Sequence, residues 1–232
     1  MLDFYSEFKD YATKHMGVSG IQFHYWEQLQ NTLYSNVSVS GSLTPYILEE
    51  REMRVTQMDI FSRLMMDRIL WVAGPVNDGM STIVQAQLMF LDSVQKKDIT
   101  MHIDSPGGSV KSGLSMVDVM DYVKSDIRTV NTGMAASMGS VLLGAGTKGK
   151  RSSLKHSTTM LHQSSGGFGG NIQDAEISMK EWKKVNNILF KLLGEYCGKT
   201  AKEVAQDATR DFWLNAEEAK KYGIIDEVIK RK

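Results

Sequence analysis

The sequence has 232 residues, with little cysteine, little proline and no excess of charge of either sign. The single cysteine, Cys197, excludes an intramolecular disulfide and the usual cysteine-based metal sites. Basic and acidic residues number 27 each, which argues against nucleic acid or an anionic membrane as the main partner. No apolar run approaches the roughly 18 residues of a membrane span, and the first residues are too polar and acidic for a secretory signal. We therefore expect a cytoplasmic protein with no membrane association, no metal and no cofactor.

The length fits one domain with an appendage. The stretch 35–42 is rich in serine, valine and glycine, and it predicts a joint in the chain. We expect an N-terminal extension at residues 1–42, either a removable propeptide or an ordered cap, and one domain at residues 43–232.

After this joint, patterns typical of strands and of helices alternate. Stretches of apolar and β-branched residues predict strands at 69–73, 99–103 and 127–132. Helical spacing of apolar residues predicts helices at 81–94 and 109–123. Strands that alternate with helices of this length imply right-handed crossovers and a largely parallel α/β core.

The most informative residue is Ser137, which follows a predicted strand and lies in the first turn of a helix predicted from Ala135 onward. Backbone N–H groups at a helix start have no partner within the helix, and the helix dipole favours negative charge there. A serine that becomes an alkoxide, beside a carbonyl that becomes an oxyanion, needs these conditions. The surrounding residues only half match the Gly-x-Ser-x-Gly turn of hydrolases. Tight packing of a helix on a sheet would explain the small residues equally well.

A nucleophilic serine needs a base, and the base needs an orienting acid. Of the five histidines, His162 is the best placed, because it ends a predicted strand and precedes a glycine-rich segment that could line a cleft. Asp211 lies between two short helical patterns, in a turn that can point inward. On local evidence, a structural histidine and a solvated surface aspartate remain open alternatives.

A second glycine signal lies at 103–109, where Gly107 and Gly108 join a predicted strand to a predicted helix. Without side chains at these positions, the backbone N–H groups can face a ligand. An ordinary strand-to-helix turn would give the same pattern.

Four motifs then occur in a fixed order: Ser-Pro-Gly-Gly at 105–108, Gly-Met-Ala-Ala-Ser-Met-Gly-Ser-Val-Leu-Leu at 133–143, Met-Leu-His-Gln at 160–163, and Thr-Arg-Asp-Phe-Trp-Leu-Asn-Ala-Glu-Glu-Ala-Lys-Lys-Tyr-Gly-Ile-Ile-Asp at 209–226. From about Leu43 to the C-terminus, the chain resembles the proteolytic subunits of the Clp protease family (ClpP). The resemblance implies a ClpP/crotonase-like α/β fold and a serine endopeptidase of protein quality control. Residues 43–232 would form the peptidase domain.

The resemblance also implies roles for individual residues. Ser137 would be the nucleophile, His162 the base and Asp211 the residue that orients the base. The backbone N–H groups of Gly108 and Met138 would form the oxyanion hole. The segment 164–170 would pair with substrate as a β-strand, and the substrate-strand residues would be Gly107, Gly166 and Gly167.

The resemblance further implies partners and assembly. Unfolded polypeptides would be delivered by an AAA+ ATPase of the ClpX, ClpA or ClpC type and cut inside a chamber. The chamber would be made of two heptameric rings stacked face to face, either of this chain alone or mixed with a ClpP paralogue. From 171 to 197 apolar residues recur at helical spacing, which predicts a helix about 40 Å long. In the family this helix is the projecting handle between rings.

The chain departs from the family pattern at several positions. Ser164 and Ser165 replace a proline and an apolar residue that many relatives carry, which makes the substrate strand less rigid. Thr209 replaces an acidic residue that commonly pairs across rings with the following arginine. Thr100 and His102 stand where relatives often carry tyrosines of the ATPase docking pocket, so we expect docking to be altered or directed to a different partner.

Two other functions remain open. The chain could be a ring component of little activity beside a more active paralogue, which the substitutions favour and the complete triad opposes. It could also be an acyl-CoA hydratase of the same fold, which would use the oxyanion glycines but not a Ser-His-Asp set. The sequence does not identify the ATPase or the cleavage preference.

Overall fold

The computed structural model describes residues 46–51, 54–165 and 171–230, with side chains described from residue 58 onward. Every described residue belongs to one compact unit, Pro45–Lys232. The expected extension at residues 1–42 lies outside the described residues, so its boundary stays a prediction.

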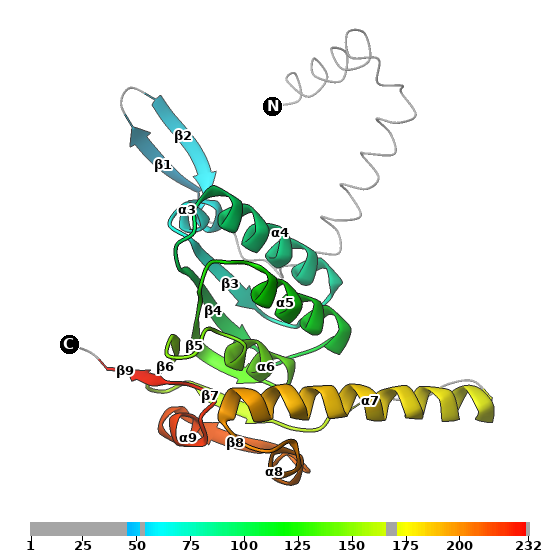
Figure 1. Cartoon of the computed structure of the whole chain (residues 1–232). Helices are drawn as coiled ribbons and strands as arrows, with labels where there is room; N and C mark the ends of the chain where they lie inside the picture. The colour runs from blue at the N-terminus through cyan, green and yellow to red at the C-terminus, as the bar shows by residue number, and fades with distance from the viewer. Residues whose placement is uncertain (1–45, 52–53, 166–170, 231–232) are drawn as a thin grey trace, which may run out of the picture. The chain divides into compact units, whose positions relative to one another are not determined.

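The core of the described unit is a seven-stranded, mainly parallel sheet (Figure 1). Five strands run parallel in the order β3 (Ile69–Ala73), β4 (Ile99–Ser105), β5 (Ile127–Ala136), β6 (Arg151–Leu154) and β9 (Glu227–Ile229). The long strand β5 pairs with β6 through its first half and with β7 (Thr158–Leu161) through its last residues. Strand β8 (Phe212–Asn215) joins β7 antiparallel. The predicted α/β fold with a largely parallel sheet is confirmed.

Two further strands, β1 (Tyr46–Arg51) and β2 (Arg54–Asp59), form an antiparallel hairpin before the short helix α3 (Ile60–Met66). The other helices of the described residues are α4 (Asp78–Val94), α5 (Val110–Tyr122), α6 (Met138–Gly144), α7 (Ile172–Cys197), α8 (Ala201–Asp207) and α9 (Ala216–Tyr222).

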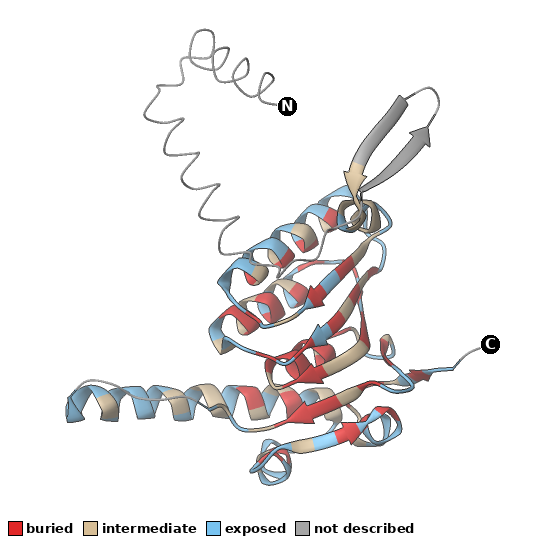
Figure 2. Ribbon diagram, turned by 180° about the vertical axis from the view of Figure 1, so that it is seen from behind, coloured by how far each residue is buried: buried red, intermediate tan, exposed pale blue. Residues whose placement is uncertain are grey.

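Helices α4, α5 and α6 lie over one face of the sheet, and each of them carries buried residues (Figure 2). The strand residues that face these helices alternate with exposed or half-buried ones, as in β4, where Ile99, Met101 and Ile103 are buried and Thr100 and His102 are half-buried. Side chains along a strand point to opposite faces of the sheet in turn, so Thr100 and His102 lie on the face of β4 opposite to Ile99, Met101 and Ile103.

Helix α7 matches its predicted limits almost to the residue, because its caps are encoded locally. The side chain of Asn171 accepts a hydrogen bond from the Asp174 N–H at the start, and Gly198 ends the helix in the left-handed conformation (φ 67). Its buried residues, Leu189, Leu193 and Gly194, all lie in the C-terminal half. The N-terminal half extends past the strands of the sheet (Figure 1).

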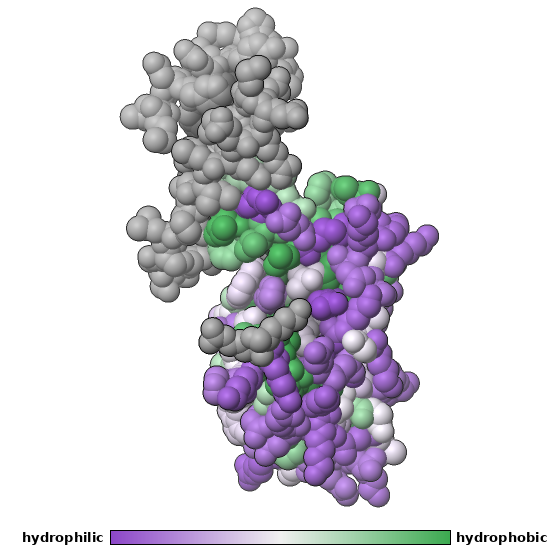
Figure 3. Space-filling model, turned by 90° about the vertical axis from the view of Figure 1, so that its left-hand side faces the viewer, coloured by the Kyte–Doolittle hydropathy of each residue, from purple (hydrophilic) through white to green (hydrophobic). Residues whose placement is uncertain are grey.

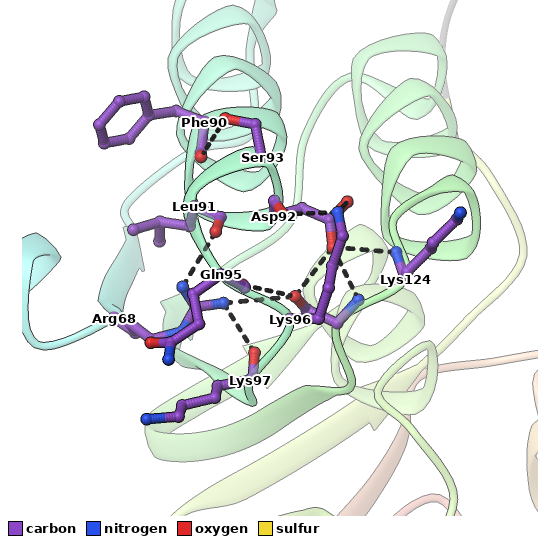
Figure 4. A network of polar contacts seen from close by, with 10 residues as sticks. Arg68, Phe90, Leu91, Asp92, Ser93, Gln95, Lys96, Lys97 and Lys124 are labelled. Carbon is purple, nitrogen blue, oxygen red and sulfur yellow. Dashed lines mark hydrogen bonds and ion pairs between the residues drawn. The ribbon is translucent and has the colours of Figure 1, made fainter.

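A network of polar contacts fixes the edge of the sheet at which β4 and β5 begin (Figure 4). The guanidinium of Arg68 donates to the carbonyl oxygens of Leu91, Lys97 and Asp98 at 2.7–3.0 Å. Asp92 accepts hydrogen bonds from the backbone N–H groups of Lys124 and Ser125. The ammonium group of Lys96 and the Ser125 groups lower the pKa of Asp92 to about 2. The end of α4 is thereby tied to Arg68, which precedes β3, and to the segment between α5 and β5.

A buried ion pair holds the C-terminal end of α7 against the sheet. Arg151, at the start of β6, donates two side-chain hydrogen bonds to the carboxylate of Asp226 and others to the carbonyls of Tyr196 and Gly223. Burial by itself would raise the pKa of Asp226, but the Arg151 guanidinium outweighs it and the net pKa lies below the usual value. Because Tyr196 belongs to α7, the pair also fixes where that helix meets the domain.

Candidate active site

The turn that carries Ser137 joins β5 to α6 without any intervening loop. Ser137 is the residue before the first residue of the helix, with φ 53 and ψ −121, and only one other non-glycine residue of the described part, Arg68, has a positive φ. Its N–H donates to the Met160 carbonyl at 2.9 Å, and its own carbonyl accepts the Ser140 hydroxyl at 2.6 Å. These bonds hold a conformation that is costly for a residue with a Cβ. The helix begins at Met138 and not at Ala135 as predicted, because the strand continues to Ala136.

Glycines allow a second turn to approach this one closely. A Cβ on Gly107 would lie 2.6 Å from the Ser137 Cβ and 2.9 Å from the Met138 nitrogen. A Cβ on Gly139 would lie 2.9 Å from the Ser105 carbonyl oxygen. Only glycine fits at such separations, so the turn after β4 and the turn after β5 lie in direct contact.

His162 reaches Ser137 because of strand pairing. Strand β7 runs parallel to the end of β5, with Ala136 opposite Met160, and His162 directly follows Leu161, the last residue of β7. Its Nε2 atom lies 2.8 Å from the Ser137 Oγ. Of the three described histidines, only His162 contacts Ser137. His102 stacks on Trp71 within the sheet, with ring centroids 4.8 Å apart, and His156 lies in the turn before β7.

Asp211 lies opposite His162 for the same kind of reason. Strand β8 pairs antiparallel with β7, and Leu161 is opposite Phe212, so the residue before β8 faces the residue after β7. The Asp211 Oδ1 lies 3.3 Å from the His162 Nδ1. The side chain of Asp211 is 61 % exposed and that of His162 is 21 % exposed. As predicted, Asp211 lies between two short helices, α8 and α9; the strand β8, which the sequence did not predict, follows it directly.

The three side chains predicted to act together are therefore in contact in one row. A carboxylate beside Nδ1 favours the imidazole form that carries its proton on Nδ1, which leaves the Nε2 lone pair facing the serine hydroxyl. In that form the imidazole can take the proton of the Ser137 hydroxyl.

The two predicted backbone donors also lie at this site. Met138 is the first residue of α6, so its N–H has no acceptor within the helix. Gly108 pairs with Val76, but that pairing uses the Gly107 carbonyl and the Ser109 N–H, so the N–H of Gly108 lies outside it. With φ 151 and a Cβ position 2.3 Å from the Val76 oxygen, residue 108 has to be glycine. Both N–H groups are adjacent to the Gly107–Ser137 contact.

A pocket opens beside Ser137 and His162. It is lined further by residues of α5, α6 and α7 and by the segment after β7, namely Val110, Met138, Ser140, Val141, Ser164, Leu189 and Leu193. Its walls are mainly apolar, which suits contact with an apolar group of a bound molecule. Sequence reasoning missed Val110, Val141, Leu189 and Leu193, although the spacing of Leu189 and Leu193 already placed them on one face of a helix.

Other predicted features are not described at this site. Gly166 and Gly167 lie outside the described residues, so their part in a substrate strand stays a prediction. Within the described side chains, no group of three or more histidine, cysteine, aspartate or glutamate residues is arranged to hold a metal ion. No helix in the described part of the chain combines the length and the apolar character needed to cross a membrane.

Comparison with known proteins gives consistent matches along the chain. A family model described as Clp protease matches residues 50–232. The chain is 47 % identical over 227 residues to an ATP-dependent Clp protease proteolytic subunit of Bacteroides fragilis strain YCH46, covering 97 % of this chain and 99 % of that protein. It is 43 % identical over 227 residues to the protein of that description from Porphyromonas gingivalis strain W83, covering 97 % and 98 % of the two chains. The corresponding protein of Streptococcus pyogenes serotype M5 is 44 % identical over 190 residues, covering 81 % of this chain and 97 % of the relative.

Proposed function

The chain belongs to the Clp protease family, and on this premise we propose that Ser137, His162 and Asp211 carry its chemistry. The protein is a serine peptidase that degrades proteins together with an AAA+ ATPase partner. The observation that supports the residue assignment best is the row of contacts at 2.8 Å and 3.3 Å, which starts from the strained turn at Ser137.

In this mechanism the Ser137 Oγ attacks the carbonyl carbon of a peptide bond while the His162 Nε2 takes the hydroxyl proton. The oxygen of the former carbonyl becomes negative and accepts hydrogen bonds from the N–H groups of Gly108 and Met138. His162 then gives its proton to the leaving amine, and an acyl-serine remains. Water, deprotonated by His162, hydrolyses this ester and regenerates the serine. Asp211 holds the imidazole in the required orientation throughout.

The substrate is an unfolded polypeptide bound in extended form. Backbone hydrogen bonds to the segment after His162 and to the Gly107 turn would bind it as an added β-strand, with Gly166 and Gly167 in that strand. Such binding reads the peptide backbone, so it supports cleavage of many sequences into short peptides.

Members of this family form oligomers and work with Clp ATPases, and the chain carries exposed apolar surface that suits this. In the N-terminal half of α7, Ile172 is 80 % exposed and Ile177 is 68 % exposed. On α4, Phe90 and Val94 are likewise exposed. The view in Figure 3 shows hydrophobic side chains gathered in the upper part of one face, with hydrophilic ones over most of the lower part. Single exposed apolar residues are common, but a projecting helix with several of them indicates a partner surface.

We also propose how the subunits assemble and which ATPase they work with. Two heptameric rings stack into a tetradecamer, and α7 forms the handle between them. The partner is a cytoplasmic ATPase of the ClpX, ClpA or ClpC type, and a paralogous subunit could share the rings.

Casein degradation tests the proposed function. The purified protein should degrade casein only when a Clp ATPase and ATP are added, because folded or bulky chains have to be fed into the chamber. Short fluorogenic peptides should be cut without the ATPase. Failure to cut either substrate, with the ATPase shown to be active on another proteolytic subunit, would favour the inactive ring component instead.

Native mass spectrometry tests the assembly. We expect a mass of fourteen subunits, or of seven at low protein concentration. Asp substitutions at Ile172 and Ile177 should lower the mass to single rings, because charge replaces the exposed apolar surface of α7. A stable monomer with full casein-degrading activity would contradict the assembly.

A further inference from the structure

The side chain of Asn186, on α7, binds the segment that follows His162 in the chain. Ser164 lies two residues after His162, and both its backbone N–H and its hydroxyl contact the Oδ1 of Asn186, each at 2.9 Å. A backbone N–H can only donate, so the amide atom that faces it must be the carbonyl oxygen. The orientation of the Asn186 side chain is thereby fixed by the chemistry of its partner.

The position of Asn186 on α7 connects this contact to the pocket. Leu189 and Leu193 follow at i+3 and i+7, so they share a face of the helix with Asn186. Both leucines are buried and line the pocket beside Ser137, and Ser164 lines it as well. One face of α7 therefore supplies two lining residues of the pocket, Leu189 and Leu193. The same face holds a third lining residue, Ser164, through its hydrogen bonds to Asn186.

Asn186 is not explained by a need of the helix, because it neither favours helix formation nor caps an end of α7. Asparagine is a weaker helix former than alanine, and it lies in the interior of α7, far from either cap. Its neighbour Asn187 has the same side chain but is exposed to solvent. The two asparagines differ in what they contact, and only the first one faces the site.

His162 is held by other groups. Its strand β7 pairs with β5 and β8, the N–H of Gln163 donates to the Ala208 carbonyl at 3.0 Å, and Asp211 contacts its ring. Loss of the Asn186 contact would free Ser164 and leave these supports of His162 in place. The contact thus acts on the pocket more than on the proton-transferring groups.

We propose that Asn186 is a positioning residue for substrate binding: by accepting two hydrogen bonds from Ser164, it fixes the wall of the pocket that receives the substrate side chain next to the bond being cut. The proposal rests on the proposed function, because it takes Ser137 as the nucleophile. Its signature is a change in KM with little change in kcat, since the pocket contributes to binding and the triad stays in place.

The test is steady-state cleavage of a short fluorogenic peptide with a leucine before the reporter group. Asn186→Ala should raise KM about tenfold, the value of one or two lost hydrogen bonds, with kcat changed by less than about twofold. Asn187→Ala is the matched control on the same helix and should behave as the unaltered protein. Asn186→Asp keeps an oxygen acceptor and should restore KM to within about twofold. The rate at which a small fluorophosphonate labels Ser137 should be unchanged in all three.

Several results would overturn the proposal. Equal KM values for Asn186→Ala and Asn187→Ala would remove the role of the contact. A fall in kcat and in the labelling rate would mean that Asn186 acts on His162. An Asn186→Asp protein as impaired as Asn186→Ala, or a loss of native mass in Asn186→Ala, would show a general structural role. The proposed function fails in a different way, namely if the unaltered protein does not cut the peptide or if Ser137→Ala cuts it equally well.

Discussion

Ser137→Ala is expected to lower peptidase kcat/KM by at least about a thousandfold. Alanine leaves no nucleophile at the end of β5, while the turn and the His162 contacts with Asp211 remain. His162→Ala and Asp211→Asn should each nearly abolish activity too, because the imidazole loses its function or its orientation. Combining the substitutions should add little further loss, since the three side chains act as one unit.

The measurement is peptide cleavage together with labelling by a serine-reactive fluorophosphonate. Labelling should disappear in Ser137→Ala and persist in Ser93→Ala, a control at an exposed serine of α4. Thermal unfolding should be similar in both, which separates lost chemistry from lost folding. If Ser137→Ala and the unaltered protein were labelled equally, Ser137 would not be the nucleophile. If the unaltered protein is labelled and Ser137→Ala is not, the hydratase function is excluded.

Gly107→Ala is expected to lower kcat/KM by at least about a hundredfold, comparable to the loss of one oxyanion donor. The added Cβ would lie 2.6 Å from the Ser137 Cβ, 2.7 Å from the Ala136 oxygen and 2.9 Å from the Met138 nitrogen. These are backbone atoms or the nucleophile itself, so they can give way only by displacing the catalytic turn. The left-handed conformation of Gly107, with φ 92, adds a further cost for any residue with a side chain.

Gly149→Ala is the matched control for this substitution. Gly149 has a similar φ of 87, but no atom lies within 4 Å of the position that its Cβ would take. Alanine there should cost about 1–2 kcal/mol of stability through backbone strain alone and leave kcat/KM of the folded protein unchanged. If Gly107→Ala and Gly149→Ala lowered kcat/KM equally, the close approach of the two turns would have no part in catalysis.

Local sequence patterns were enough to predict several helices and strands of the fold. Stretches of apolar and β-branched residues predicted strands at the positions of β3, β4 and β5, and helical spacing of apolar residues predicted α7. The α/β class followed from the order of these elements, and the motifs around Ser137 and His162 gave the family. Each of these patterns involves residues that lie close together in the sequence, so it can be recognised without the tertiary structure.

The assembly of the site depends on contacts between segments that lie far apart in the sequence. The contact of His162 with Ser137 depends on β7 pairing with the end of β5, and that of Asp211 depends on β8 pairing with β7. The positive φ of Ser137 and the contact of Asn186 with Ser164 also carry no local signal. Helical spacing puts Leu189 and Leu193 on one face of α7, but it does not say that this face lines the pocket. These features arise from groups far apart in sequence, and the energy that holds them comes from packing and strand pairing between segments that no local pattern brings together.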